Sequence, residues 1–144
     1  MHFVNAIIRR AMSSLPSSTA SANPFLRARR NLIGLCQLTS HGDMVENYEK
    51  AASMVRRARA DHPNCRMVFL PECFDFIAPT RDETLANASQ EDGECISKYR
   101  ELAKETGMWL SLGGFHHRVG DGKVRLPFNT HLLLNDNGLL VVVE

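Results

Sequence analysis

The sequence has 144 residues, a length that suits one domain with its own hydrophobic core. Its hydrophobic fraction of 44% is ordinary for a globular domain, and no apolar run is long enough to cross a bilayer. The net charge is +1, yet residues 1–30 carry five arginines and no acidic residue, whereas residues 31–144 carry 12 basic and 16 acidic residues. This acidic body argues against a nucleic-acid-binding surface, and we expect neither a nucleic acid nor a membrane as partner.

Residues 1–30 combine their arginines with five serines, a composition typical of a mitochondrial transit peptide. Residues 7–10 are expected to begin a short amphipathic helix there, and the alternative is a disordered tail. The sequence therefore predicts a targeting leader or disordered tail at residues 1–30 and a domain at residues 31–144. The expected location is the mitochondrion and/or the cytoplasm, with Met12 as an internal start for a cytoplasmic form.

The domain is expected to begin with a strand at residues 31–38, followed by a helix. Asp43, with Glu46 three residues later, forms a start of the capping-box type, and the proline-containing segment 61–64 ends the helix. Apolar residues of the strand and of one helical face are predicted to be buried. These residues are Leu32, Ile33, Leu35, Leu38, Val45, Tyr48, Ala52 and Val55.

The second predicted helix has Ile96, Tyr99, Leu102 and Ala103 on its inward face and Gly107 as its C-terminal stop. The alternation of strands and helices predicts an α/β fold. The elements after the first helix are expected in this order: a strand at 66–70, a long loop at 74–90 with a helical turn near 83–88, a helix at 93–106, a strand at 108–112, a turn at 120–122, and strands at 128–134 and 139–143 joined by a hairpin at 135–138.

The segment from Met67 to Phe76 is the most informative part of the chain. Its apolar residues predict a short buried strand that must end at Pro71, because proline has no N–H to donate to a sheet. Glu72 is then expected at the carboxyl end of a core strand, where open α/β folds place their chemistry. Between Leu70 and Phe74 its carboxylate would lose hydration, which suits a general base. The alternative is an exposed loop glutamate.

Four segments in fixed order resemble the first half of a nitrilase-superfamily (CN hydrolase) domain, over residues 31–144. The similar branch is that of the deaminated glutathione amidases, including the form fused to a fragile-histidine-triad domain. These segments are Leu-Cys-Gln-Leu-Thr-Ser at 35–40, Phe-Leu-Pro-Glu at 69–72 with Phe-Asp-Phe-Ile-Ala at 74–78, Tyr-Arg-Glu-Leu-Ala at 99–103, and Trp-Leu-Ser-Leu-Gly-Gly-Phe-His at 109–116.

The resemblance implies the amino-terminal part of a nitrilase-type four-layer α-β-β-α sandwich. It also implies a cofactor-independent amidase that acts on a small-molecule amide such as deaminated glutathione and is a homo-oligomer in its full-length form. The family's catalytic triad is Glu-Lys-Cys, and Glu72 matches its glutamate, the inferred general base. The lysine and cysteine motifs would lie past Glu144, so the chain is expected to be a fragment that is inactive alone.

None of the four cysteines matches the family's nucleophile, and Cys73 should diverge from Glu72 if the segment is extended. His116 and His117 are consecutive in a predicted strand and should point apart, and no histidine spacing suits a metal, so no metal site is expected. The alternative to an amidase is an inactive half-domain that binds a full-length partner through an exposed sheet face. A nucleotide-binding domain is disfavoured by the absence of a Gly-x-Gly-x-x-Gly motif.

Overall fold

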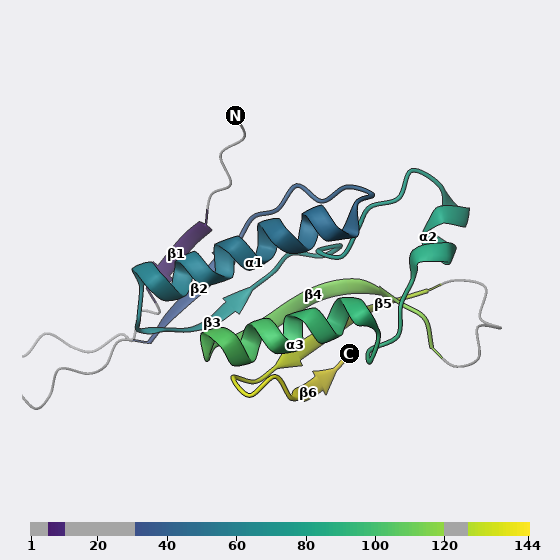
Figure 1. Cartoon of the computed structure of the whole chain (residues 1–144). Helices are drawn as coiled ribbons and strands as arrows, with labels where there is room; N and C mark the ends of the chain where they lie inside the picture. The colour runs from purple at the N-terminus through teal and green to yellow at the C-terminus, as the bar shows by residue number, and fades with distance from the viewer. Residues whose placement is uncertain (1–5, 11–30, 120–126) are drawn as a thin grey trace, which may run out of the picture.

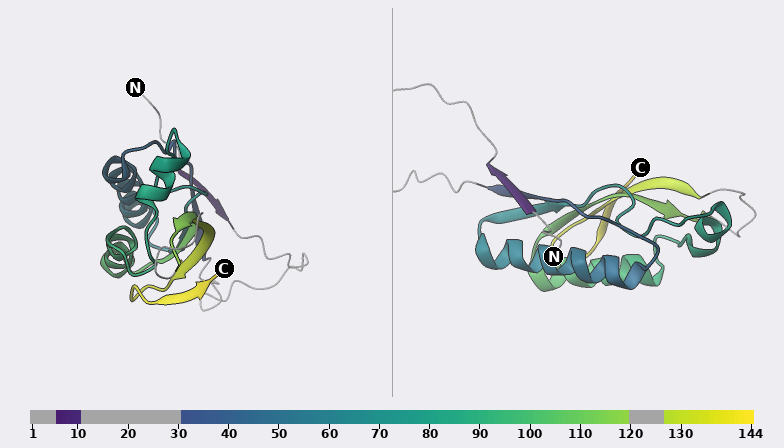
Figure 2. Two further views of the ribbon diagram at one scale, coloured as in Figure 1. Left: turned by 90° about the vertical axis from the view of Figure 1, so that its right-hand side faces the viewer. Right: turned by 90° about the horizontal axis from the view of Figure 1, so that it is seen from above.

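The computed structural model describes residues 6–10, 31–119 and 127–144, and the described residues form one mixed sheet with two long helices on one face (Figures 1 and 2). The six strands lie in the order β1-β2-β3-β4-β5-β6. The elements are β1 (Ala6–Arg10), β2 (Leu32–Cys36), α1 (Met44–Asp61), β3 (Cys65–Phe69), α2 (Arg81–Asn87), α3 (Glu94–Thr106), β4 (Trp109–His117), β5 (Phe128–Leu134) and β6 (Leu140–Val143).

The centre of the sheet is parallel. Strands β2, β3 and β4 run in the same direction, with α1 and α3 as the crossovers, whereas β1, β5 and β6 add antiparallel edges. The predicted α/β fold is therefore confirmed. The loops that follow β2 and β3 leave the sheet at the same end of the strands, because the carboxyl ends of parallel strands lie side by side.

Helix α1 begins where the sequence predicts, because the Asp43 carboxylate accepts hydrogen bonds from the backbone N–H groups of Val45 and Glu46. Its inward face passes through Asn47, Ala51, Val55 and neighbouring positions at helical spacing. The prediction for Val45 was wrong. Its side chain is 61% exposed because it lies two positions, about 200° of helical rotation, from Asn47.

Helix α3 follows its prediction closely. Its inward side chains are buried and its last turn ends at Gly107, which adopts the left-handed conformation with a φ of 60°. Gly138 has a φ of 71° in the hairpin between β5 and β6, where the Asn135 side chain accepts hydrogen bonds from the N–H groups of Asn137 and Leu139. The predicted hairpin is confirmed.

Two expectations about strands and one about a helical turn need correction. Residues 6–10 form β1, which pairs with β2, and not the start of a helix. Strand β4 continues to His117, because Gly113 and Gly114 lie in an irregular stretch of its pairing with β5 and do not end the strand. Helix α2 is a complete short helix capped by Thr80. The expected turn at 120–122 lies outside the described residues.

The other face of the sheet carries no helix (Figure 2), and we call it the open face. Its side chains alternate with those that face α1 and α3, so Gly34 and Cys36 are buried while Leu35 is 37% exposed. The predicted burial of Leu35 is therefore wrong. Cross-strand pairing assigns seven apolar residues to the open face: Ile33, Leu35, Met67, Phe69, Trp109, Leu133 and Val142.

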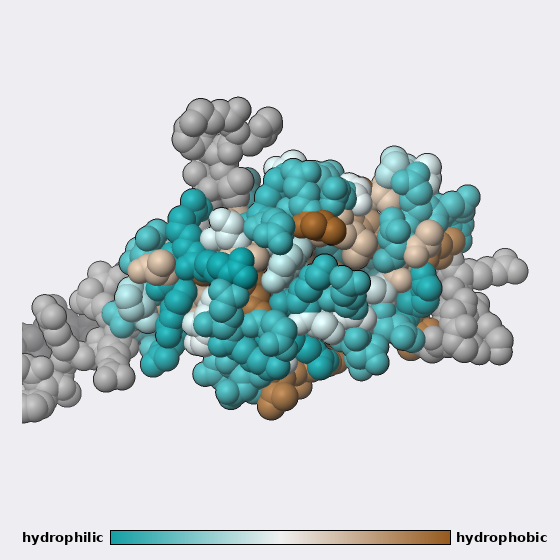
Figure 3. All heavy atoms as spheres, viewed as in Figure 1, coloured by the Kyte–Doolittle hydropathy of each residue, from teal (hydrophilic) through white to brown (hydrophobic). Residues whose placement is uncertain are grey.

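The outer surface of the two long helices is polar, in contrast to the apolar open face. Figure 3 shows it covered mainly by hydrophilic residues, with small hydrophobic spots. In the part of the chain that the structure describes, no helix has the length and apolar character needed to span a membrane.

Candidate active site

Glu72 lies directly beyond the carboxyl end of β3, as the sequence predicts. The Leu70 N–H still donates to the Ser111 carbonyl of β4 at 2.9 Å, and Pro71 then ends the pairing. The chain turns at Glu72 and Cys73, and Cys73 takes a left-handed φ of 54°. We call residues 70–78 the Glu72 loop.

Two glycines of β4 hold the Glu72 loop against the sheet. A Cβ atom on Gly113 would lie 2.3 Å from the Pro71 carbonyl oxygen and 2.7 Å from the Glu72 nitrogen. The Gly114 carbonyl accepts a hydrogen bond of 2.7 Å from the Cys73 N–H. The two glycines therefore allow the backbone of the Glu72 loop to approach β4 closely.

The Glu72 carboxylate contacts Asn129 of β5, whose Nδ2 donates to Oε1 at 2.7 Å. The Glu72 side chain is exposed, so the expectation that Leu70 and Phe74 shield it is wrong. Both of those side chains are buried in the core beneath the helices, 5% and 0% exposed, because the turn directs Glu72 away from them. The role of Glu72 as a general base stays a prediction.

Asp75 is a second carboxylate of the Glu72 loop, and the sequence analysis missed it. It is 2% exposed and accepts hydrogen bonds from the backbone N–H of His116, at 2.9 Å, and from its ring Nδ1, at 3.2 Å. This bond to Asp75 raises the pKa of His116, whose ring also stacks on Phe76. A carboxylate between two phenylalanines was the available signal, because a buried acid needs a partner.

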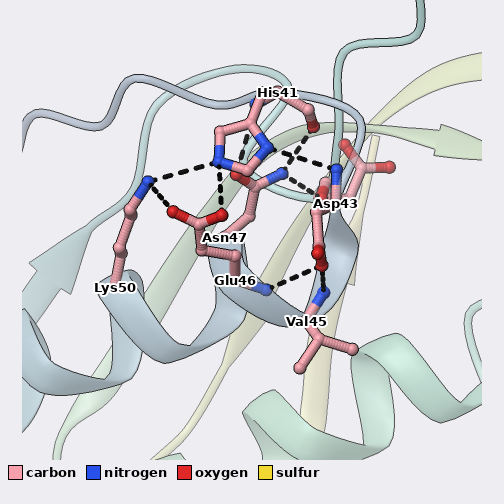
Figure 4. Close-up of polar contacts among 7 residues, drawn as sticks. His41, Asp43, Val45, Glu46, Asn47 and Lys50 are labelled. Carbon is pink, nitrogen blue, oxygen red and sulfur yellow. Dashed lines mark hydrogen bonds and ion pairs between the residues drawn. The ribbon is translucent and has the colours of Figure 1, made fainter.

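Asn47 of α1, also missed, ties the loop after β2 to the Glu72 loop. It is 2% exposed, and its Nδ2 donates to the backbone carbonyls of His41 at 2.7 Å and Asp75 at 3.0 Å. Its Oδ1 accepts from the His41 N–H (Figure 4). The Ile77 N–H in turn donates to the His41 carbonyl. The loops after β2 and β3 are therefore both hydrogen-bonded to the Asn47 side chain.

The ring of His41 belongs to the surface part of the same cluster (Figure 4). Its Nε2 lies 3.2 Å from a Glu46 carboxylate oxygen, and Glu46 pairs with Lys50 one turn along α1. The capping box is therefore incomplete, because the Glu46 carboxylate contacts His41 and Lys50 while the Asp43 N–H donates to His41 Nδ1.

No cysteine of the chain has the features of an activated nucleophile. Burial raises the pKa of both Cys36 and Cys95 to about 12, and burial also raises that of Cys65. The pKa of the Cys73 thiol is raised by burial and by the negative charges of Asp75 and Glu72. A raised pKa disfavours the reactive thiolate. Cys73 lies in a turn, which corrects the extended backbone assumed for it.

His116 and His117 point apart, as predicted. His116 binds Asp75, whereas His117 Nδ1 lies 3.1 Å from the Thr130 hydroxyl and its ring stacks on Phe115. Within residues 31–119 and 127–144, no group of three or more His, Cys, Asp and Glu side chains could hold a metal ion. The candidate site is therefore formed by the carboxylates of the Glu72 loop, beyond the carboxyl end of β3 and beside β4.

Comparison with known proteins identifies the fold and the family. The model of the carbon-nitrogen hydrolase family matches residues 32–143. The nitrilase and fragile histidine triad fusion protein NitFhit of Caenorhabditis elegans is 44% identical over 110 residues, which are 76% of this chain and 24% of that protein. The human deaminated glutathione amidase is 43% identical over 111 residues, 76% of this chain and 33% of that protein.

Solved structures support the same family and fold. The crystal structure of the C. elegans NitFhit protein matches with a TM-score of 0.67 and 41% identity, over 78% of this chain and 26% of that one. A carbon-nitrogen hydrolase of Helicobacter pylori G27 matches with a TM-score of 0.66 at 18% identity, over 78% and 38%, which supports the fold alone. This chain thus spans about a quarter to a third of the curated relatives named here. Its fold is that of the nitrilase superfamily, and the chain belongs to the carbon-nitrogen hydrolase family.

Proposed function

We propose that the protein containing this chain hydrolyses the carbon-nitrogen bond of a small, non-peptide amide, with Glu72 as its general base. The observation that carries this proposal is the position of Glu72. Its carboxylate extends from the carboxyl end of β3, on a loop held by Gly113 and Gly114. Membership of the carbon-nitrogen hydrolase family supports the reaction class.

The chemistry requires a thiolate that attacks the amide carbonyl, a base that takes the thiol proton, and a donor that stabilises the tetrahedral intermediate. Glu72 is suited to the second task, because Oε1 is bound by Asn129 while Oε2 has no hydrogen-bond partner among the described residues. We assign the nucleophilic cysteine and the lysine of the triad to residues outside this chain. The raised pKa values of the four cysteines present support that assignment.

For the substrate we propose deaminated glutathione or a similar small amide. The support is the 43% identity to the human protein whose name states this activity. Hydrolysis would give a carboxylic acid and the amine of the cleaved amide. For deaminated glutathione, which has no primary amide, that amine is a cysteine-containing dipeptide, so release of a primary amine follows the reaction directly.

The test is to express the open reading frame that contains this chain and to measure the release of a primary amine from deaminated glutathione. Replacing the base, Glu72→Gln, should lower kcat/KM on the order of 10²-fold or more. The matched control is Glu101→Gln, which changes an exposed carboxylate of α3 that pairs with Lys104 on the helix surface. An unchanged rate for Glu72→Gln would rule out the base assignment.

The open face favours a second candidate, an inactive half-domain that binds a full-length partner. Leu35 is 37% exposed and Trp109 and Val142 are each 36% exposed on this face, and exposed apolar patches mark interaction surfaces. Sequencing the mature transcript past the codon for Glu144 discriminates the two. A stop codon there favours the half-domain, and continued coding through a lysine and a cysteine motif favours the amidase.

We also propose a mitochondrial and/or cytoplasmic location and a homo-oligomeric full-length form. The five arginines of residues 1–30 and their lack of carboxylates support the location. A fluorescent fusion with and without residues 1–30 tests it, since deletion should abolish import. Light scattering of the full-length protein tests the oligomeric form.

A further inference from the structure

We propose that Asn129, with the space provided by Gly114, is the positioning residue of the Glu72 carboxylate. This inference rests on the proposed role of Glu72 as a base and adds a residue that acts through it. The two residues are 57 positions apart in sequence and meet only because β5 pairs with β4.

The geometry of β4 creates the contact. Asn129 is paired with His116 across the two strands, and its side chain lies over the neighbouring Gly114 on the way to Glu72. A Cβ atom on Gly114 would lie 1.7 Å from Asn129 Oδ1 and 2.6 Å from its Cγ. Any residue larger than glycine would therefore displace the Asn129 side chain from the carboxylate.

The contact has a direct chemical consequence. A glutamate side chain that projects from a turn has several free rotatable bonds, and the hydrogen bond of 2.7 Å from Asn129 Nδ2 selects one position of its carboxylate. Oε1 is held while Oε2 is left for the incoming proton, so that positioning is complete before the substrate binds.

A purely structural role for Asn129 fits the surroundings poorly. Its side chain is exposed, and among the described residues its only hydrogen bond to another side chain is the one to Glu72. Removing it therefore leaves no buried polar group unpaired, so the effect should be on the reaction and not on the folded state.

The first test uses the enzyme encoded by the open reading frame that contains this chain. Asn129→Ala should lower kcat about 10-fold or more with KM nearly unchanged, because the carboxylate is no longer held in position before the substrate binds. Asn129→Asp, which keeps the size but replaces the amide donor with a second carboxylate, should lower kcat at least as much. Asn137→Ala, an exposed asparagine at the hairpin tip, is the control with unchanged kinetics.

A double-mutant cycle tests the part played by Gly114. Gly114→Ala should lower kcat in the parent but have little further effect in the Asn129→Ala background, because the side chain that it displaces is then absent. Additive effects would overturn the proposed role of Gly114. A parent-like kcat for Asn129→Ala, in an enzyme that Glu72→Gln inactivates, would overturn the positioning role alone. An active Glu72→Gln enzyme would instead overturn the proposed function.

Discussion

Gly113→Ala is the substitution whose effect follows most directly from the geometry. The added Cβ atom would lie 2.3 Å from the Pro71 oxygen, 2.4 Å from the Pro71 carbonyl carbon and 2.7 Å from the Glu72 nitrogen. All three are backbone atoms, so no side-chain rotation relieves the clash. Ordinary van der Waals contact begins at 3.4 Å, and the Glu72 loop must therefore retreat from β4 by roughly 1 Å.

This retreat has two measurable effects. Overpacking of this kind costs about 1–3 kcal/mol of folding free energy, which should lower Tm by roughly 3–12 °C in a domain of this size. A displacement of about 1 Å at a reacting group can also lower the rate on the order of 10²-fold. The Cys73–Gly114 hydrogen bond, 2.7 Å long in the parent, should lengthen in the variant.

Thermal unfolding followed by circular dichroism measures the first effect, and amine release from deaminated glutathione by the enzyme containing this chain measures the second. The control is Gly42→Ala, because a Cβ there would meet only the Ile77 carbonyl oxygen at 3.8 Å, and its Tm and rate should stay close to the parent values. A Gly113→Ala variant with parental Tm and parental rate would refute the inference that this glycine sets the position of the Glu72 loop.

Three further outcomes are expected. Asn47→Ala should destabilise the chain by about 1–3 kcal/mol in urea unfolding, because it leaves the buried carbonyl of Asp75 without its donor. The hydrogen bond to Asp75 raises the pKa of His116. This pair therefore contributes stability that is fully present below the ordinary histidine pKa of 6.5 and is lost as pH rises through the raised pKa. His116→Gln should lower the free energy of unfolding in urea more at pH 5.5 than at pH 9. Cys36 and Cys95, whose pKa values are about 12, should react with a disulfide reagent at pH 8 much more slowly than in urea.

Each outcome has a control and a contrary result. Asn64→Ala, in the exposed segment after α1, is the control for Asn47, and equal destabilisation by both would contradict the anchoring role. A cost of His116→Gln that is the same at both pH values would show that charge on the ring does not stabilise the pair. Labelling of Cys36 at the same rate in the folded and unfolded chain would show that the core admits the reagent.

Local patterns predicted most elements of this fold because they depend on neighbouring residues. The helical spacing of Ile96, Tyr99 and Leu102 was enough to give the inward face of α3, and Gly107 gave its end. The strand before Glu72 was recognisable because Pro71 must end it. The same local reasoning failed for Leu35, since a strand's alternation shows that one face differs from the other but not which face is covered.

The sequence by itself determined the α/β alternation, the family resemblance and the place of Glu72 at the end of a strand. Only the tertiary structure decided what surrounds that carboxylate: an exposed position, the Asn129 donor from β5, and the Asp75–His116 pair, which spans 41 residues. The physical reason is that these contacts depend on the register between β4 and β5 and on the approach of a loop to Gly113 and Gly114. Those features are set by packing across the sheet, and no local pattern in the chain encodes them.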